Sequence, residues 1–175
     1  MLESYGTMAG QFFGLVSLVL CVVAFASKRD DRLMVLLISA NVAFALQFVF
    51  LESWTAAALT VLVIARIALA RRYPGSKRAM AGVLAASAVA AVLTWQGWAD
   101  LPAIVATVLG TVSMFLLQGI TMRVFLGLAA LAWMLSHALA GSIGGTLAEA
   151  LVIVTNTITI YRLVRARRRY PEVFD

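Results

Sequence analysis

The chain has 175 residues, of which 63% are hydrophobic and 13% charged, and its mean hydropathy is +0.97. Soluble domains are about 45–50% apolar and about 25% charged, so a soluble fold of this size could not bury this much apolar surface. The net charge of +6 comes from short basic stretches between apolar runs, which argues against a nucleic-acid partner. The composition therefore predicts a protein embedded in a lipid bilayer.

Seven apolar runs are long enough to cross a bilayer as helices, which takes about 20 residues with a range of about 17–25. In chain order they are Met8–Ser27, Leu33–Leu51, Trp54–Ala70, Ala79–Trp98, Leu101–Gln118, Val124–Ala140 and Gly145–Val164. They lack the alternation of apolar and polar residues that marks the strands of a membrane barrel. The predicted fold class is an all-α membrane protein with seven transmembrane helices in one domain over residues 1–175.

The segments between the runs have the chemistry of loops and helix ends. Ser27–Arg32 is strongly charged, residues 71–78 combine basic side chains with a Pro-Gly turn, and residues 141–145 form a glycine-rich link. Asp100, followed by Pro102, predicts a helix N-cap with proline in the first turn.

The basic residues predict how the chain is oriented. With the N-terminus outside, all 14 Lys and Arg residues fall in the odd-numbered connections, in the C-terminal tail or on the inner part of an adjoining span. The N-terminal segment and the even-numbered connections contain none. The positive-inside rule then predicts an outside N-terminus and a cytoplasmic C-terminus.

The first three and last three spans share a pattern, which predicts an internal repeat. At an offset of 91 residues the matching pairs are Arg32 with Arg123, Thr55 with Thr146, and Arg71 with Arg162. Because one span separates the halves, both halves begin outside, and the repeat is parallel, as in some transporters. The predicted parts are a three-helix bundle over 8–72, a linker helix over 79–98, a second three-helix bundle over 101–164, and a basic cytoplasmic tail over 165–175.

This 3+1+3 layout resembles the SWEET, PQ-loop and MtN3-like superfamily, and local patterns resemble the YgjV-type family of bacterial inner-membrane proteins. The patterns are Gly10-Gln11-Phe12-Phe13-Gly14, Ser27-Lys28 to Arg32, Leu51-Glu52-Ser53-Trp54-Thr55-Ala56-Ala57, and Gly144-Gly145-Thr146 to Glu149. The Pro-Gln pair of PQ-loop proteins and the mid-span prolines of SWEET proteins are absent. The resemblance implies a bacterial inner-membrane location and a pocket between the two bundles.

Five polar residues inside the predicted spans are candidates for binding a substrate, because polar groups are costly in hydrocarbon. They are Asn41, Asn156, Glu149, His137 and Arg66. From the helix rise, Asn41 and Asn156 lie near the midplane, Glu149 and His137 nearer the outer surface, and Arg66 near the inner end of its span. The resemblance to SWEET-like transporters implies that Asn156 contacts substrate.

Each of these residues also has a structural interpretation. The asparagines could form interhelical hydrogen bonds, and Glu149 could reach water at the outer surface. His137 could be a packing residue or could pair with Glu149. Arg66 could extend its long side chain to the inner interface.

The sequence offers little for catalysis, since it has a single His and a single Cys and no paired carboxylates or metal-ligand spacing. We therefore expect no enzyme, no cofactor and no metal. The predicted function is a small-solute transporter or facilitator with a central polar pocket; the alternative is a non-transporting receptor, chaperone or lipid-binding regulator. The expected partners are the bilayer and a small polar solute of unknown identity, a homo-oligomer remains open, and no nucleic acid is expected.

Overall fold

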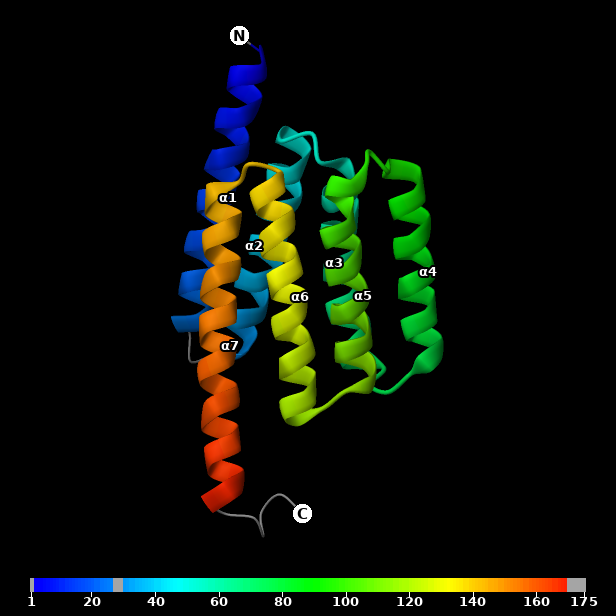
Figure 1. Cartoon of the computed structure of the whole chain (residues 1–175), viewed down its shortest axis with the longest axis vertical. Coiled ribbons are helices and arrows are strands. Elements are labelled where there is room, and N and C mark those ends of the chain that lie inside the picture. The colour runs from blue at the N-terminus through cyan, green and yellow to red at the C-terminus, as the bar shows by residue number, and fades with distance from the viewer. Residues whose placement is uncertain (1, 27–29, 170–175) are drawn as a thin grey trace.

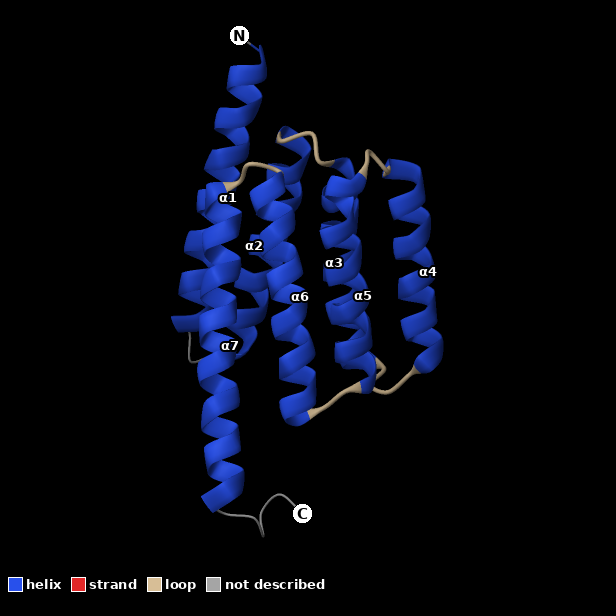
Figure 2. Cartoon of the chain, viewed as in Figure 1, coloured by secondary structure: helices blue, strands red, loops and turns tan. Residues whose placement is uncertain are grey.

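The computed structural model describes residues 2–26 and 30–169, and these ranges contain seven α-helices, one short 3-10 helix and no strand (Figure 2). The elements are α1 (Leu2–Ala26), α2 (Asp30–Phe50), α3 (Trp54–Arg72), α4 (Lys77–Thr94), η1 (Trp98–Asp100), α5 (Leu101–Leu116), α6 (Gly119–Leu139) and α7 (Ile143–Arg169). The predicted all-α fold class is confirmed.

Among the described residues, six helices are long and apolar enough to cross a membrane, with η1 and α5 forming one span. The remaining helix, α2, contains a shorter apolar stretch, Val35–Phe50, within its described residues. α2 packs along both α1 and α3. The start of α1 and the end of α7 lie at opposite ends of the molecule (Figure 1), as an odd number of passes requires.

The two ends of the helix assembly differ in charge. One end, called the basic end below, carries Arg71, Arg72, Lys77 and Arg78 around the α3–α4 connection and Arg167–Arg169 in the last turn of α7. The opposite end, called the far end, carries the α2–α3, α4–α5 and α6–α7 connections, which contain no Lys or Arg.

Six helices form a ring in which each packs against the next: α1 on α2, α2 on α3, α3 on α5, α5 on α6, α6 on α7, and α7 on α1. α4 packs on α3 and α5 from outside this ring and lies at the edge of the molecule (Figure 1). Each predicted half is therefore an arc of the ring. The interpretation of the two arcs as repeated bundles stays a prediction.

The main core lies toward the far end of the ring. Phe48 near the end of α2 packs with Trp133 of α6, with ring centroids 6.2 Å apart. Small residues at the starts of α3 and α5 belong to the same core, including Ala56 and Ala103, which have no exposed surface. Small side chains let membrane helices approach closely, so the far end of the ring is tightly packed.

Several predicted boundaries differ from the observed ones. α4 ends at Thr94 rather than Trp98, because the chain turns at Gly97, whose φ of 149° favours glycine. The predicted first span and charged loop include residues 27–29, which lie outside the described residues. The predicted basic tail is described only as far as Arg169.

Asp100 occupies the predicted N-cap position of α5, with Pro102 in the first turn, but the predicted capping bond is not made. Its Oδ2 accepts hydrogen bonds from the Gln96 backbone N–H at 2.7 Å and from the Thr55 hydroxyl at 3.0 Å. These two donors turn the buried carboxylate away from the helix amides. Asp100 thereby ties the start of α3 to the α4–α5 connection.

Candidate functional site

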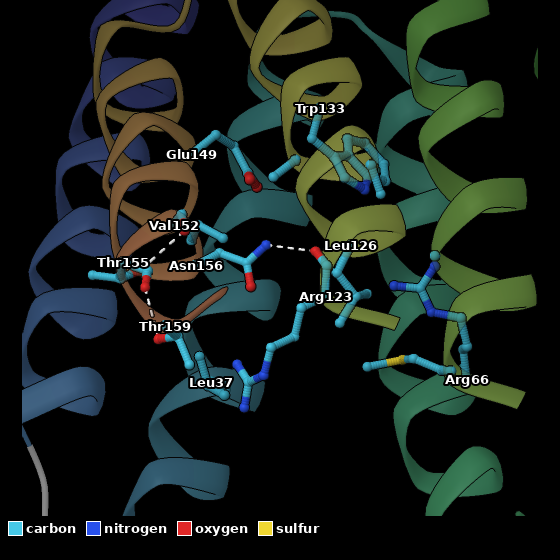
Figure 3. A pocket seen from close by; sticks show the side chains of 14 residues that line it. Leu37, Arg66, Arg123, Leu126, Trp133, Glu149, Val152, Thr155, Asn156 and Thr159 are labelled. Atoms are coloured by element: carbon cyan, nitrogen blue, oxygen red, sulfur yellow. Dashed lines mark hydrogen bonds between the residues drawn. The ribbon is translucent and has the colours of Figure 1, made fainter. Parts of the chain in front are cut away.

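Two adjoining cavities lie inside the ring, with volumes of about 500 Å³ and about 150 Å³. They share five lining residues: Leu37, Arg66, Trp133, Glu149 and Val152. The larger cavity extends along α6 and α7 to Arg123 and Thr159, toward the basic end (Figure 3). The smaller one reaches Cys21 of α1 and Phe44 of α2. Together they occupy the centre of the ring.

All five predicted site residues line these cavities. Asn156 lines the larger cavity, Asn41 and His137 line the smaller one, and Arg66 and Glu149 line both. Residues from α2, α3, α6 and α7 are thus brought to one central space. Their role in binding a substrate stays a prediction.

Arg66 of α3 is held inside the ring, with only 6% of its surface exposed, rather than extended to the membrane interface. Its Nη1 donates a long hydrogen bond of 3.4 Å to the Thr107 carbonyl of α5, and its buried Nε has no partner. The guanidinium lies over Gly110, where an added Cβ would be 2.5 Å from Nη1. Glycine at this position therefore makes room for the charged group.

Glu149 and Asn156 share one face of α7, as their spacing of two turns predicts. The Asn156 side-chain amide donates to the Arg123 carbonyl of α6 at 2.6 Å, which is an interhelical bond. The Glu149 carboxylate points into the cavity (Figure 3), and among the described residues it has no hydrogen-bond or ion-pair partner. Asn41 instead bonds within its own helix, to the Leu37 carbonyl at 2.9 Å.

His137 pairs with Gln47, not with Glu149. The Gln47 side-chain amide donates to His137 Nδ1 at 3.0 Å, and both side chains are fully buried. The imidazole also stacks on Phe48, with centroids 4.5 Å apart and planes 17° apart. The sequence did not predict this pair, because helical depth does not tell which way a side chain points. The pair closes the cavity toward the far end.

The first and last helices meet through two of the glycine-containing motifs. The Gln11 side chain of α1 donates to the Gly141 carbonyl and accepts from the Ile143 backbone N–H at 3.1 Å. Gly14 lies directly against Gly144 of α7. Gln11 and Gly14 of α1 therefore contact residues 141–144, and this contact closes the ring.

A closed ring of apolar helices around a cavity with charged side chains defines a multi-pass membrane protein. The chain belongs to the Imp-YgjV family, described as bacterial inner membrane protein, whose family model matches residues 8–167. It is 23% identical over 164 residues to the Inner membrane protein YgjV of Escherichia coli, covering 94% of this chain and 89% of that protein. No solved structure shows a significant match. The predicted family and the bacterial inner-membrane location are confirmed.

In the ranges that the structure describes, no group of three or more His, Cys, Asp or Glu side chains comes together to hold a metal ion. The charged groups at the cavity are instead separate: an arginine on α3, a glutamate on α7, and Arg123 nearer the basic end of α6.

Proposed function

We propose that this protein is a small-solute transporter or facilitator of the bacterial inner membrane, in which the central cavity is the solute site. One observation carries the proposal: Arg66 and Glu149 line the same cavity at the centre of the ring, and neither has a charged partner among the described residues. Ionisable residues inside membrane proteins usually face a water-filled or substrate-filled pathway.

The cost of desolvation supports this proposal over a purely structural role. A buried charge without a partner is strongly destabilising, and a helix core could satisfy the same packing with apolar side chains. A solute or water in the cavity would offset the desolvation cost of both charged groups. The presence of an unpaired guanidinium and an unpaired carboxylate is therefore better explained by a ligand that binds to them and dissociates.

The shape of the cavity supports a form that is open toward the basic end. The larger cavity extends to Arg123 and Thr159, whereas the Gln47–His137 pair and the Phe48 ring close the far end. We place the basic end in the cytoplasm, with the N-terminus outside and the C-terminus inside, because basic loops favour the cytoplasmic side. In this proposal the structure is an inward-open state of the transport cycle.

The order of helices in the ring supports two parallel repeats of the SWEET-like kind. Exchanging α1 with α5, α2 with α6, and α3 with α7 maps every neighbouring pair of the ring onto another neighbouring pair. The α3–α5 contact then corresponds to the α7–α1 contact, and α4 is left outside the symmetry. A site on the axis of such a repeat is a known transporter design.

The experiment is a thermal-shift screen of the purified protein against small polar solutes, followed by uptake of each hit into proteoliposomes. A solute that binds the native state raises the apparent Tm. Asn156→Leu should remove the shift and the uptake while leaving the elution profile unchanged. Thr157→Val is the matched control, because Thr157 is exposed and its one hydrogen bond within the described ranges is to Ile153 of the same helix. Binding without uptake would instead favour the non-transporting receptor, and no binding by any solute would overturn the proposal.

A further inference from the structure

We propose that the solute bound in the central cavity is a small zwitterion, with its carboxylate at Arg66 and its ammonium group at Glu149. This inference rests on the proposed transport function and names the class of its substrate. It is carried by the placement of two unpaired, opposite charges on opposite walls of one cavity.

The Arg66 guanidinium is prepared to receive a carboxylate. It is more than nine-tenths buried, and among the residues that the structure describes its Nε has no partner and its only hydrogen bond is the 3.4 Å contact with the Thr107 carbonyl. A guanidinium presents its donors in a planar fork that matches a carboxylate. Gly110 lets the guanidinium lie against the α5 backbone, since an added Cβ at this position would come within 2.5 Å of Nη1.

The Glu149 carboxylate faces Arg66 across the cavity. In Figure 3 the two charged groups point toward the middle of the site from opposite sides, Glu149 from α7 and Arg66 from α3. Both also line the smaller cavity of about 150 Å³. A small molecule in this space would therefore be bordered by both charged side chains, and Trp133, which lines both cavities, offers an apolar wall for its carbon atoms.

Solutes of other charge types fit less well. An anion would pair with Arg66 but would leave Glu149 unpaired and close to a like charge. A cation would pair with Glu149 but would leave Arg66 unpaired and close to a like charge. A neutral sugar would leave both charges without a counter-ion. A zwitterion compensates both at once and adds no net charge to the buried site.

Arg123 does not change the balance of one positive and one negative side chain in the smaller cavity. It lines the larger cavity but not the smaller one, and it lies near the start of α6, at the basic end. Its long side chain can remain in contact with water there. We assign it to the entrance, where it attracts the carboxylate of an arriving solute.

The test measures binding of charge-matched probes to the purified full chain by thermal shift and titration calorimetry. The zwitterions are glycine, L-alanine and 4-aminobutyrate. Each is compared with its methyl ester, which keeps only the ammonium group, and with its N-acetyl form, which keeps only the carboxylate. Glycerol and glucose are the neutral probes. We expect at least one zwitterion to raise the apparent Tm and its two blocked forms to have little effect.

Two variants then test whether Arg66 binds the carboxylate of the zwitterion and Glu149 binds its ammonium group. Arg66→Gln and Glu149→Gln should each weaken zwitterion binding at least about tenfold, because each leaves one ligand charge unpaired. Relative to the unchanged protein, Glu149→Gln should bind the N-acetyl form better and Arg66→Gln should bind the methyl ester better. A merely structural role would not produce this exchange of preference. If Arg66→Gln does not fold, the near-isosteric Glu149→Gln decides the question.

The outcomes separate the substrate class from transport itself. If a neutral probe or a singly charged probe binds through Asn156 and no zwitterion does, the zwitterion inference is wrong, and uptake of that probe into proteoliposomes then decides the proposed function. If no probe of any charge type binds, both are wrong.

Discussion

Gly144 of α7 lies so close to Gly14 of α1 that a Cβ at Gly144 would be 2.3 Å from the Gly14 carbonyl carbon and 2.6 Å from its oxygen. Both residues are buried. The two helices therefore cross backbone to backbone, an approach that small residues permit in membrane helix pairs. Gln11 holds the α6–α7 connection against α1 next to this crossing.

Gly144→Ala should destabilise the protein, because the new methyl group meets backbone atoms that cannot move independently of α1. We expect a loss of about 1–3 kcal/mol, typical of overpacking, read as a lower Tm in detergent. Gly82→Ala on α4 is the control, since an added Cβ there meets nothing within 4 Å. The helix propensity of alanine should make that change neutral or stabilising by up to about 1 kcal/mol. Equal shifts for both variants would show that the α1–α7 crossing is not tightly packed.

Gln47 and His137 should be energetically coupled. Gln47→Leu leaves the buried His137 Nδ1 without its donor, which should cost about 1–3 kcal/mol of unfolding free energy. His137→Phe should likewise leave the Gln47 side-chain amide without its hydrogen-bond acceptor. The double variant should then lose less than the sum of the two, by at least about 0.5 kcal/mol. Additive losses in thermal or denaturant unfolding would mean that this hydrogen bond contributes nothing specific.

Gly110→Ala should impair solute binding more than stability. The added Cβ would lie 2.5 Å from Arg66 Nη1, but this atom is the end of a flexible side chain and can move away. We expect the unliganded Tm to change little and the Kd of the solute found in the screen to rise about tenfold, equivalent to about 1.4 kcal/mol. Calorimetric titration measures it, with Gly82→Ala again as the control. Unchanged affinity would place the solute away from Arg66.

The orientation can be read by labelling single cysteines in a Cys21→Ser background. Ala99→Cys lies at the exposed far end, and Lys77→Cys lies at the exposed basic end. With the basic end cytoplasmic, a membrane-impermeant maleimide added to spheroplasts should label the cysteine at position 99 at once. The cysteine at position 77 should react only after the membrane is permeabilised. The reverse pattern would overturn the proposed orientation.

Much of the fold follows from the sequence, because a chain in lipid must satisfy its backbone polar groups within each spanning segment. The apolar runs therefore predict the helices, and each of the seven predicted spans corresponds to one α-helix. The boundaries differ where local chemistry intervenes: Gly97 ends α4 early, and the charged start of α2 continues the helix beyond its apolar part. The sequence also predicts the depth of the polar residues from the constant helix rise, and that depth stays a prediction.

The sequence by itself determined that the chain spans the membrane, which polar residues lie within the spans, and that Glu149 and Asn156 share a face. Only the tertiary structure decided which partners they meet. Gln47 pairs with His137, Asn156 with the Arg123 carbonyl, and Asn41 with its own helix. The physical reason is that helices surrounded by lipid are apolar on nearly every side, so the pattern of apolar residues does not specify which face turns inward. Packing of small residues such as Gly14, Gly110 and Gly144 sets that rotation, and with it the placement of Arg66 and Glu149 in one cavity.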